Sequence, residues 1–271
     1  MKLSKKTIAK TALLGAFFAY FALVSLYAQN PKFTLGAQPS PINIDVANHE
    51  SNVEFKYEHP FIGTLRATVE TLEAQDLLEE KGIQVDLGTR EAMEGNKIIV
   101  DGQEYHLRQF HFHAPSEHKI NGKRTLGEIH FVHKSDEGMF AVVGAFIKQG
   151  KHDNEAFKEI LEKFPTALKK IDNLSDLSVE HRKKSKIELV NQLDVTNLLP
   201  LEGAHVYRYL GSKTSGDLAP NVKWILLTHP IKFSNEQITI LQQIQSTGTK
   251  VHDCLRETSV KIERSRGGEA K

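Results

Sequence analysis

The feature that most constrains the fold of this chain is a stretch in which histidines alternate with phenylalanines. His111 and His113 are separated by one residue within a run that favours β-strand. Successive side chains of a strand point to opposite faces, so these two imidazoles point the same way. His130 follows in a second β-like run, with an Asn-Gly turn signal at 121–122 between them. The pattern predicts two neighbouring antiparallel strands that bring three imidazoles together.

Three converging imidazoles are typical ligands of a catalytic zinc site, in which the fourth tetrahedral position stays open for water. A histidine pair at this spacing is a weak signal alone, because structural histidines also occur on strands. Its surroundings strengthen it, since Gln109 shares the strand face of His111 and Glu128 shares that of His130. An amide or carboxylate on the second ring nitrogen fixes the tautomer and angle of a zinc-bound imidazole. The residues predict a zinc site, with structural histidines as the alternative.

The beginning of the chain is typical of an exported protein. The first ten residues hold four lysines and no acid, and residues 11–28 are uncharged and mostly apolar. We expect a secretory signal peptide at 1–28, with an uncleaved membrane anchor as the alternative. The protein would then be periplasmic or secreted. The single cysteine, Cys254, cannot form an internal disulfide and is either a buried thiol or a link between chains.

The charge of the exported part argues against a nucleic-acid partner. Of the 35 basic and 34 acidic residues, four lysines and no acids lie within 1–28, which leaves 31 basic residues against 34 acidic ones. A net charge of −3 with neutral histidines provides no basic surface for nucleic acid.

The hydrophobic pattern predicts a single domain at 29–263, followed by a polar tail at 264–271. Alternation predicts strands at 53–57, 83–87, 97–100, 104–113, 126–133, 139–148, 184–190, 206–209 and 222–227. Helical spacing predicts helices at 153–171 and 234–244, and a helix or helical insertion within 64–81. The expected class is α+β, mainly β, built on a large and mostly antiparallel sheet with peripheral helices.

Residues 109–118 and 128–133 closely resemble the zinc-binding signature of the α-class carbonic anhydrases, in their shorter bacterial form. Residues 38–44 are similar to the Gln-Ser-Pro-Ile-Asn-Ile segment of that family, with one extra proline, and residues 207–212 resemble the approach to its threonine loop. The similarity extends from about Gln38 to about Ile244. It implies a twisted sheet of roughly ten strands with zinc at the base of a cone.

The resemblance implies a role for each matching residue. The implied zinc ligands are His111, His113 and His130, with Gln109 and Glu128 orienting His111 and His130. Thr214 and Glu117 match the pair that aims a zinc-bound hydroxide at CO₂. The implied pocket residues are Val132, Val142, Lys213, Ser215 and Trp224. The implied reaction is the reversible hydration of CO₂ to bicarbonate and a proton.

The chain departs from the family at the proton relay. Alignment on Gly82 places Ile83 where the family has its shuttling histidine, and sliding the strand by two residues places Lys81 there. Neither residue is a histidine, so we expect either dependence on buffer or a relay by another group. The candidates for that group are His49, His59 and Glu80.

The threonine loop departs as well. Lys213 replaces a leucine of the family's CO₂ pocket, and both prolines of the loop are missing. A cation at this position would either hold anions near the zinc or extend to solvent while its stem packs. The shortened N-terminus leaves a smaller apolar cluster under the site, which favours a homodimer as a source of stability.

Three functions are consistent with these residues. The first is a zinc carbonic anhydrase acting on CO₂ and bicarbonate. The second is a carbonic-anhydrase-related zinc-binding module with low or no turnover, suggested by Ile83 and Lys213. The third is another zinc hydrolase, such as an esterase.

Overall fold

The structure is a computed structural model that describes residues 40–44, 53–71, 79–172, 184–214, 219–246 and 259–260. Several expectations concern residues outside these ranges: the signal peptide at 1–28, His49, Ser215, Cys254 and the tail at 264–271. None of the described helices has the length and apolar character needed to cross a bilayer.

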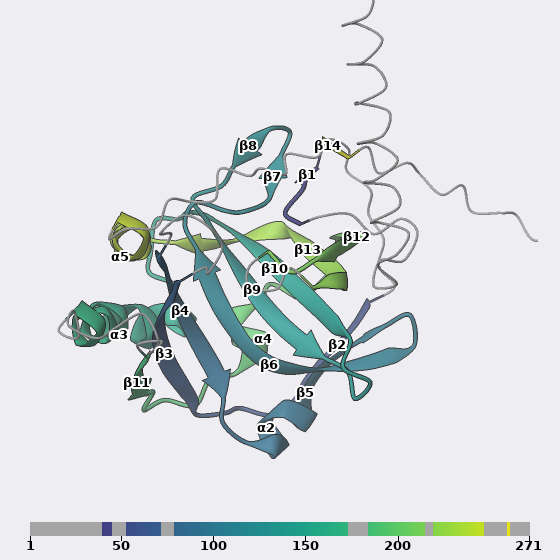
Figure 1. Ribbon diagram of the computed structural model, residues 1–271, viewed down its shortest axis with the longest axis horizontal. Coiled ribbons are helices and arrows are strands. Elements are labelled where there is room, and N and C mark those ends of the chain that lie inside the picture. Colours follow the sequence, from purple (N-terminus) through teal and green to yellow (C-terminus); the bar gives the residue numbers. More distant parts are fainter. Residues whose placement is uncertain are drawn as a thin grey trace, which may run out of the picture.

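A ten-stranded sheet forms the body of the molecule (Figure 1). Its main path has the order β11-β3-β4-β6-β9-β10-β13-β12, and β5 pairs with both β6 and β2. The strands are β2 (Val53–Tyr57), β3 (Gly63–Thr71), β4 (Glu79–Leu87), β5 (Asn96–Val100), β6 (Gln103–His113), β9 (Gly127–Lys134), β10 (Phe140–Gln149), β11 (Lys184–Glu188), β12 (Val206–Ser212) and β13 (Pro220–Phe233). The pairs among them are antiparallel except β10 with β13, which is parallel. The expected fold class, with its sheet of about ten strands, is confirmed.

Two predicted turn dipeptides lie at tight turns. Asp101 and Gly102 join β5 to β6 with φ angles of 54° and 79°, as a hairpin turn of this kind requires. Asn121 and Gly122 have φ angles of 49° and 76°. They join the short strands β7 (Lys119–Ile120) and β8 (Lys123–Arg124), which lie within the connection from β6 to β9. These two strands, with β1 (Asn43–Ile44) and β14 (Ser259–Val260), form a separate small sheet.

The helices lie around the sheet. They are α2 (Arg90–Gly95), α3 (Glu155–Asp172), α4 (Val195–Leu198) and α5 (Asn235–Ser246). Figure 1 shows α3 and α5 together along one side of the sheet, where they contact each other. The predicted capping box of α5 is present, because Ser234 Oγ accepts from the Gln237 backbone N–H at 3.2 Å and Gln237 Oε1 accepts from the Ser234 N–H at 3.3 Å.

The helix predicted within 64–81 is wrong for residues 64–71 and 79–81, which form strands. β3 and β4 pair antiparallel from Gly63 opposite Leu87 to Thr71 opposite Glu79, which leaves only residues 72–78 outside the described chain. Leu65 is fully buried opposite Val85, itself fully buried. Burial against a partner strand therefore outweighs the local helical spacing of the leucines, as tertiary context commonly does.

The two faces of the sheet differ in what covers them. Phe110 and Phe112 of β6 pack against Phe157 of α3, within the larger apolar cluster. Because neighbouring residues alternate, the residues between these phenylalanines point to the opposite face. A smaller apolar cluster that includes Ile42, Val142 and Trp224 lies apart from the larger one. The histidine face is thus the face without α3.

Candidate metal centre

Strand register brings the three predicted ligands together. His111 is paired with His130 across β6 and β9, and His113 is paired with Glu128 in the same ladder. Paired residues, and residues two apart, share a face of the sheet. The ring centroids are 5.0 Å apart for His111 and His113, 5.2 Å for His111 and His130, and 4.5 Å for His113 and His130. One ring nitrogen from each lies within 4.8 Å of the other two.

Two of the imidazoles are held in the neutral form. Gln109 Oε1 accepts from His111 Nδ1–H at 2.9 Å, which leaves Nε2 as the lone-pair nitrogen. Burial lowers the pKa of His111 well below its usual range, and the neighbouring His113 and His130 lower it further. Burial also lowers the pKa of His113 well below the usual range, with a further contribution from His130. Neutral imidazoles are the form that binds a metal.

Glu128 contacts two histidines and two backbone N–H groups of the site. Its Oε1 lies 2.7 Å from His118 Nδ1 and 2.9 Å from His130 Nε2. Its Oε2 accepts from the backbone N–H groups of Glu117 and His118, both at 3.0 Å. Burial alone would raise the pKa of this carboxyl, but the charges of His118 and His130 and the hydrogen bond from His118 hold it well below the usual range. A buried carboxylate with four donors stays ionised.

His130 differs from the other two histidines because it faces this carboxylate. Its Nε2 lies 2.9 Å from Glu128 Oε1, an ion-pair contact without hydrogen-bond geometry, so Nδ1 is the nitrogen left for the cluster. Burial lowers the pKa of His130, but the charge and close contact of Glu128 outweigh that effect, and the pKa is raised. In the absence of a metal, this histidine therefore retains a proton to higher pH than an ordinary one.

The donor set fits a zinc ion. His113 Nε2 is buried and has no hydrogen-bond partner among the described residues, with Glu117 Oε2 as far as 3.5 Å away. Buried polar atoms without partners are costly, and three imidazoles with one open position are a common zinc arrangement. A second group, His118 with Glu128 and His130, also has metal-ligand spacing. Glu128 already accepts a hydrogen bond from His118 and lies 2.9 Å from His130 Nε2, so this group orients the first.

The apolar side of the site is built by register. Val132 pairs with Val142, and Val142 pairs with Trp224 across β10 and β13. Trp224 and Val142 are buried, and the Trp224 ring lies 4.8 Å from the His130 ring, centroid to centroid. These predicted pocket residues lie together, next to the histidine cluster.

The opposite side of the site is polar, and sequence reasoning missed its residues. Gln84 of β4 pairs with His111, and Arg66 of β3 pairs with Gln84. Asp86 accepts hydrogen bonds from both Arg66, at 3.0 Å, and Gln84. The face that carries the histidines is therefore apolar towards β10 and β13 and polar towards β3 and β4.

Thr214 and Lys213 follow the end of β12. Lys213 N–H donates to Ala219 O at 2.9 Å, which closes the base of the loop that carries Thr214. Within the described chain, no hydrogen bond joins Thr214 to Glu117, so this pair remains a prediction. The Lys213 ammonium lies 4.7 Å from the centroid of the Phe140 ring.

The candidates for a proton relay lie in different parts of the structure. Gln84, and not Ile83, is the residue opposite His111, while Ile83 pairs with Ala67. The side chains of residues 67–83, Glu80 among them, lie outside the description. His59 lies against Gly95 of α2, at the end of the sheet where β5 pairs with residues 103–106 of β6. It is thus not among the groups that line the histidine cluster.

Sequence reasoning also missed a chain of hydrogen bonds behind the histidine cluster. His118 Nε2 lies 2.6 Å from the Tyr209 hydroxyl, which lies 2.8 Å from Ser40 Oγ. His118 stands inside the histidine motif, but no local pattern links it to a tyrosine 91 positions away. Sequence reasoning also missed Gly144, which lies opposite His130. A Cβ at this position would lie 2.5 Å from Leu226 Cδ2, so the site requires glycine there.

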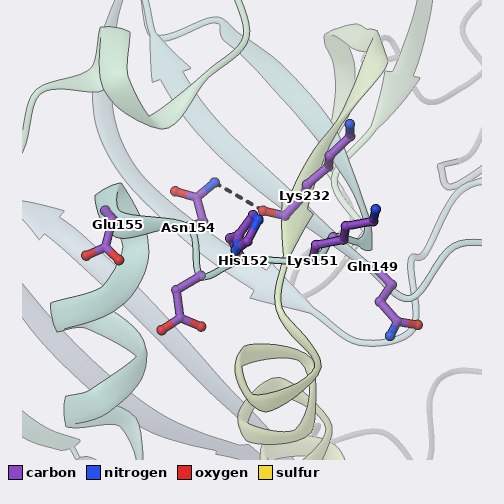
Figure 2. Close-up of a pocket in the computed structure, with 8 residues that line it drawn as sticks. Gln149, Lys151, His152, Asn154, Glu155 and Lys232 are labelled. Atoms are coloured by element: carbon purple, nitrogen blue, oxygen red, sulfur yellow. Dashed lines mark hydrogen bonds between the residues drawn. The ribbon is translucent and has the colours of Figure 1, made fainter.

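A separate hollow lies where β10 leads into α3 (Figure 2). It is lined by Gln149, Gly150, Lys151, His152, Asp153, Asn154, Glu155 and Lys232. Asn154 Nδ2 donates to Lys232 O at 3.3 Å. The lining mixes cations with acids and none of its residues is buried, so it does not form a second catalytic arrangement.

The fold and the cluster define a class of protein: a mixed β-sheet protein with a three-histidine cluster that could hold a metal ion. The chain belongs to the family of eukaryotic-type carbonic anhydrases, whose profile it matches over residues 27–265. It is 33% identical over 193 residues to Alpha carbonic anhydrase 5 of Arabidopsis thaliana, which covers 71% of this chain and 61% of that protein.

Bacterial relatives and solved structures agree with this family. The chain is 30% identical over 207 residues to a carbonic anhydrase of Klebsiella pneumoniae, covering 75% of this chain and 70% of that one. The structure of the α-carbonic anhydrase from Thermovibrio ammonificans aligns with a TM-score of 0.58 and 28% identity, over 84% of each chain. The chain spans only about three fifths of the length of the Arabidopsis relative.

Proposed function

We propose that this protein is a zinc-dependent carbonic anhydrase that catalyses the reversible hydration of CO₂ to bicarbonate and a proton. The observation that supports this best is the cluster of His111, His113 and His130, with Gln109 and Glu128 on their second ring nitrogens. A bound Zn²⁺ supplies a nucleophile at neutral pH by lowering the pKa of water to about 7.

The protein's own residues prepare the metal ligands. Burial keeps His111 and His113 neutral, so their lone pairs are available. The negative charge of Glu128 makes the His130 ring a stronger donor and fixes which nitrogen faces the metal. Gln109 and Glu128 thereby orient the His111 and His130 rings before a metal arrives.

The two sides of the site suit the two forms of the substrate. The side chains of Val132, Val142 and Trp224 offer no hydrogen bond to CO₂ near the cluster, so this wall favours an apolar gas over water. Bicarbonate is charged, so the apolar side chains of this wall do not themselves hold it. The polar side, with Gln84, Asp86 and Arg66, favours solvent for the proton that must depart.

The proposal also assigns a role to Thr214 and Glu117, which would orient the attacking water. Glu117 Oε2 is buried, has no hydrogen-bond partner among the described residues, and lies near His113 and His130. We infer that the Thr214 hydroxyl donates to this carboxylate and accepts from the attacking water. That polarity would direct the water's remaining lone pair at the carbon of CO₂.

Stopped-flow CO₂ hydration tests this function. We expect the zinc-loaded protein to accelerate hydration, the chelator-treated protein to be inactive, and added zinc to restore the rate. A zinc-loaded rate equal to the zinc-free rate would contradict the proposal.

We also propose that the protein is exported, and that 1–28 is removed on the way. The basic start and apolar run of this segment support export. Mass spectrometry of protein from a periplasmic or culture fraction should give an N-terminus at Gln29. Recovery of the full 30.5 kDa chain in the membrane fraction would favour the anchor instead. Light scattering on the same sample tests the expected homodimer.

A further inference from the structure

Lys213 places a positive charge on the apolar side of the metal site. Its Nζ lies 4.7 Å from the centroid of the Phe140 ring, within the range of a cation–π interaction. Phe140 packs against the cluster that includes Val142 and Trp224. The ammonium therefore stands on the wall proposed to receive CO₂, and the half-buried lysine does not simply extend into solvent.

The backbone fixes where this charge lies. Lys213 N–H donates to Ala219 O at 2.9 Å. The preceding residue, Ser212, exchanges two hydrogen bonds with Ser40, at 3.0 and 3.1 Å. The stem of the lysine thus starts from an anchored position, and its end lies over the Phe140 ring, closer than the Lys134 ammonium, which is 5.5 Å from the same centroid.

Register gives the separation of Phe140, over whose ring this charge lies, from the proposed metal ligands. Phe140 pairs with Lys134 of β9, four residues along that strand from His130. Four residues of a strand span about 13 Å. At about this distance, in surroundings of intermediate dielectric constant, a unit charge changes the affinity for a monovalent anion by about threefold. Salt screens such an effect, because the Debye length falls from about 30 Å at 0.01 M to about 8 Å at 0.15 M.

We propose that Lys213 is a specificity-determining residue that raises the affinity of the metal site for small monovalent anions, bicarbonate among them. This inference rests on the metal site of the proposed function. Its test requires a bound metal but does not require turnover. It predicts that the protein holds its anionic product more tightly than a form with an apolar residue at this position.

Anion binding to the Co²⁺-substituted protein tests the proposal, with thiocyanate as the probe and visible absorption as the readout. At about 0.01 M ionic strength, Lys213→Met should raise the thiocyanate Kd about threefold, and Lys213→Arg should restore it. The difference should shrink at about 0.5 M salt. Far-UV circular dichroism and Co²⁺ stoichiometry verify that each variant is folded and loaded.

Lys223→Met is the matched charge control. Lys223 precedes Trp224 on β13 and therefore points to the opposite face, where its Nζ lies 3.1 Å from Asp101 Oδ2. This control should leave the thiocyanate Kd unchanged. An unchanged Kd in Lys213→Met, or an equal rise in both lysine variants, would overturn the proposal. Failure of CO₂ hydration with the threefold effect intact would instead reject the proposed activity alone.

Discussion

At the scale of single residues, Glu128 decides how two of the site histidines, His118 and His130, are held. One buried carboxylate receives two imidazoles and two backbone N–H groups. Sequence parity predicted only its contact with His130. The remaining contacts depend on the path of residues 114–127, which no alternation pattern describes. The polar groups around Glu128 occupy both of its oxygens. A replacement that removes an acceptor therefore leaves a neighbouring N–H group without a hydrogen-bond partner.

Glu128→Gln tests these contacts. The amide keeps one acceptor oxygen but turns an NH₂ group towards N–H donors, and the buried negative charge disappears. We expect a loss of about 3–5 kcal/mol in the free energy of unfolding and a 10- to 100-fold weaker zinc affinity. Urea unfolding and zinc competition measure the two effects. Glu137→Gln, at an exposed carboxylate, is the control and should change neither.

His133 should make the stability of the protein depend on pH, and the lowered pKa of this residue gives the sign of that dependence. Its Nε2 lies 2.8 Å from the Tyr57 hydroxyl, and burial lowers its pKa to about 3. The unfolded histidine, with a pKa near 6.5, binds a proton that the folded one refuses, so stability falls as pH falls below about 6.5. Between about pH 6.5 and 4 this residue should remove about 3 kcal/mol from the free energy of unfolding.

The measurement is denaturant unfolding of the metal-free protein across that pH range. His133→Asn should reduce the slope, to which buried His111 and His113 also contribute, whereas His152→Asn, at an exposed position, should leave it unchanged. Equal slopes in all three proteins would show that acid destabilisation comes from other groups.

At the scale of elements, the register between paired strands determines which residues meet at the site, and the identity of the strands alone does not. The strands at 104–113 and 126–133 were predictable from alternation, and their antiparallel pairing followed. The strand at 63–71 was not, because Leu65 is also compatible with helical spacing and only its partner Val85 decides. The polar row of Arg66, Gln84 and His111 became visible only with that pairing.

Gly144 tests the same register from β10. It faces His130, and an added Cβ would lie 2.5 Å from Leu226 Cδ2 and 3.1 Å from Glu128 Oε1. We expect Gly144→Ala to lower the free energy of unfolding by about 1–3 kcal/mol and to weaken zinc binding. Gly88→Ala, where a Cβ meets nothing within 4 Å, is the control. Equal stability of both variants in thermal unfolding would show that the sheet relaxes around the methyl group.

At the scale of the whole molecule, the site joins an apolar half to a polar half across one sheet face. The family resemblance predicted the cluster from residues 109–133, and it predicted the wall from Val132 together with Val142 and Trp224, which lie outside that segment. It did not predict the parallel pairing of β10 with β13, which brings Trp224 beside Val142. Such a pair requires a long connection and leaves no local signal in the sequence.

Proton release should depend on carriers from outside. The family position of the shuttling histidine falls on Ile83 or Lys81, and no histidine lies in β4. We expect the CO₂ hydration rate to rise with imidazole concentration at constant pH and ionic strength. A rate that stays high and does not change with buffer would reveal an internal relay. Comparison with a bulkier buffer of similar pKa controls for general salt effects.

The hydrogen bonds from Ser40 through Tyr209 and His118 to Glu128 have a consequence for the order of assembly. Ser40 and Tyr209 are separated by 169 positions in the chain, yet both stand behind the same metal ligand. During synthesis, the three histidines emerge long before this support exists. We therefore expect the ion to be captured late, when most of the polypeptide has already been made and folded.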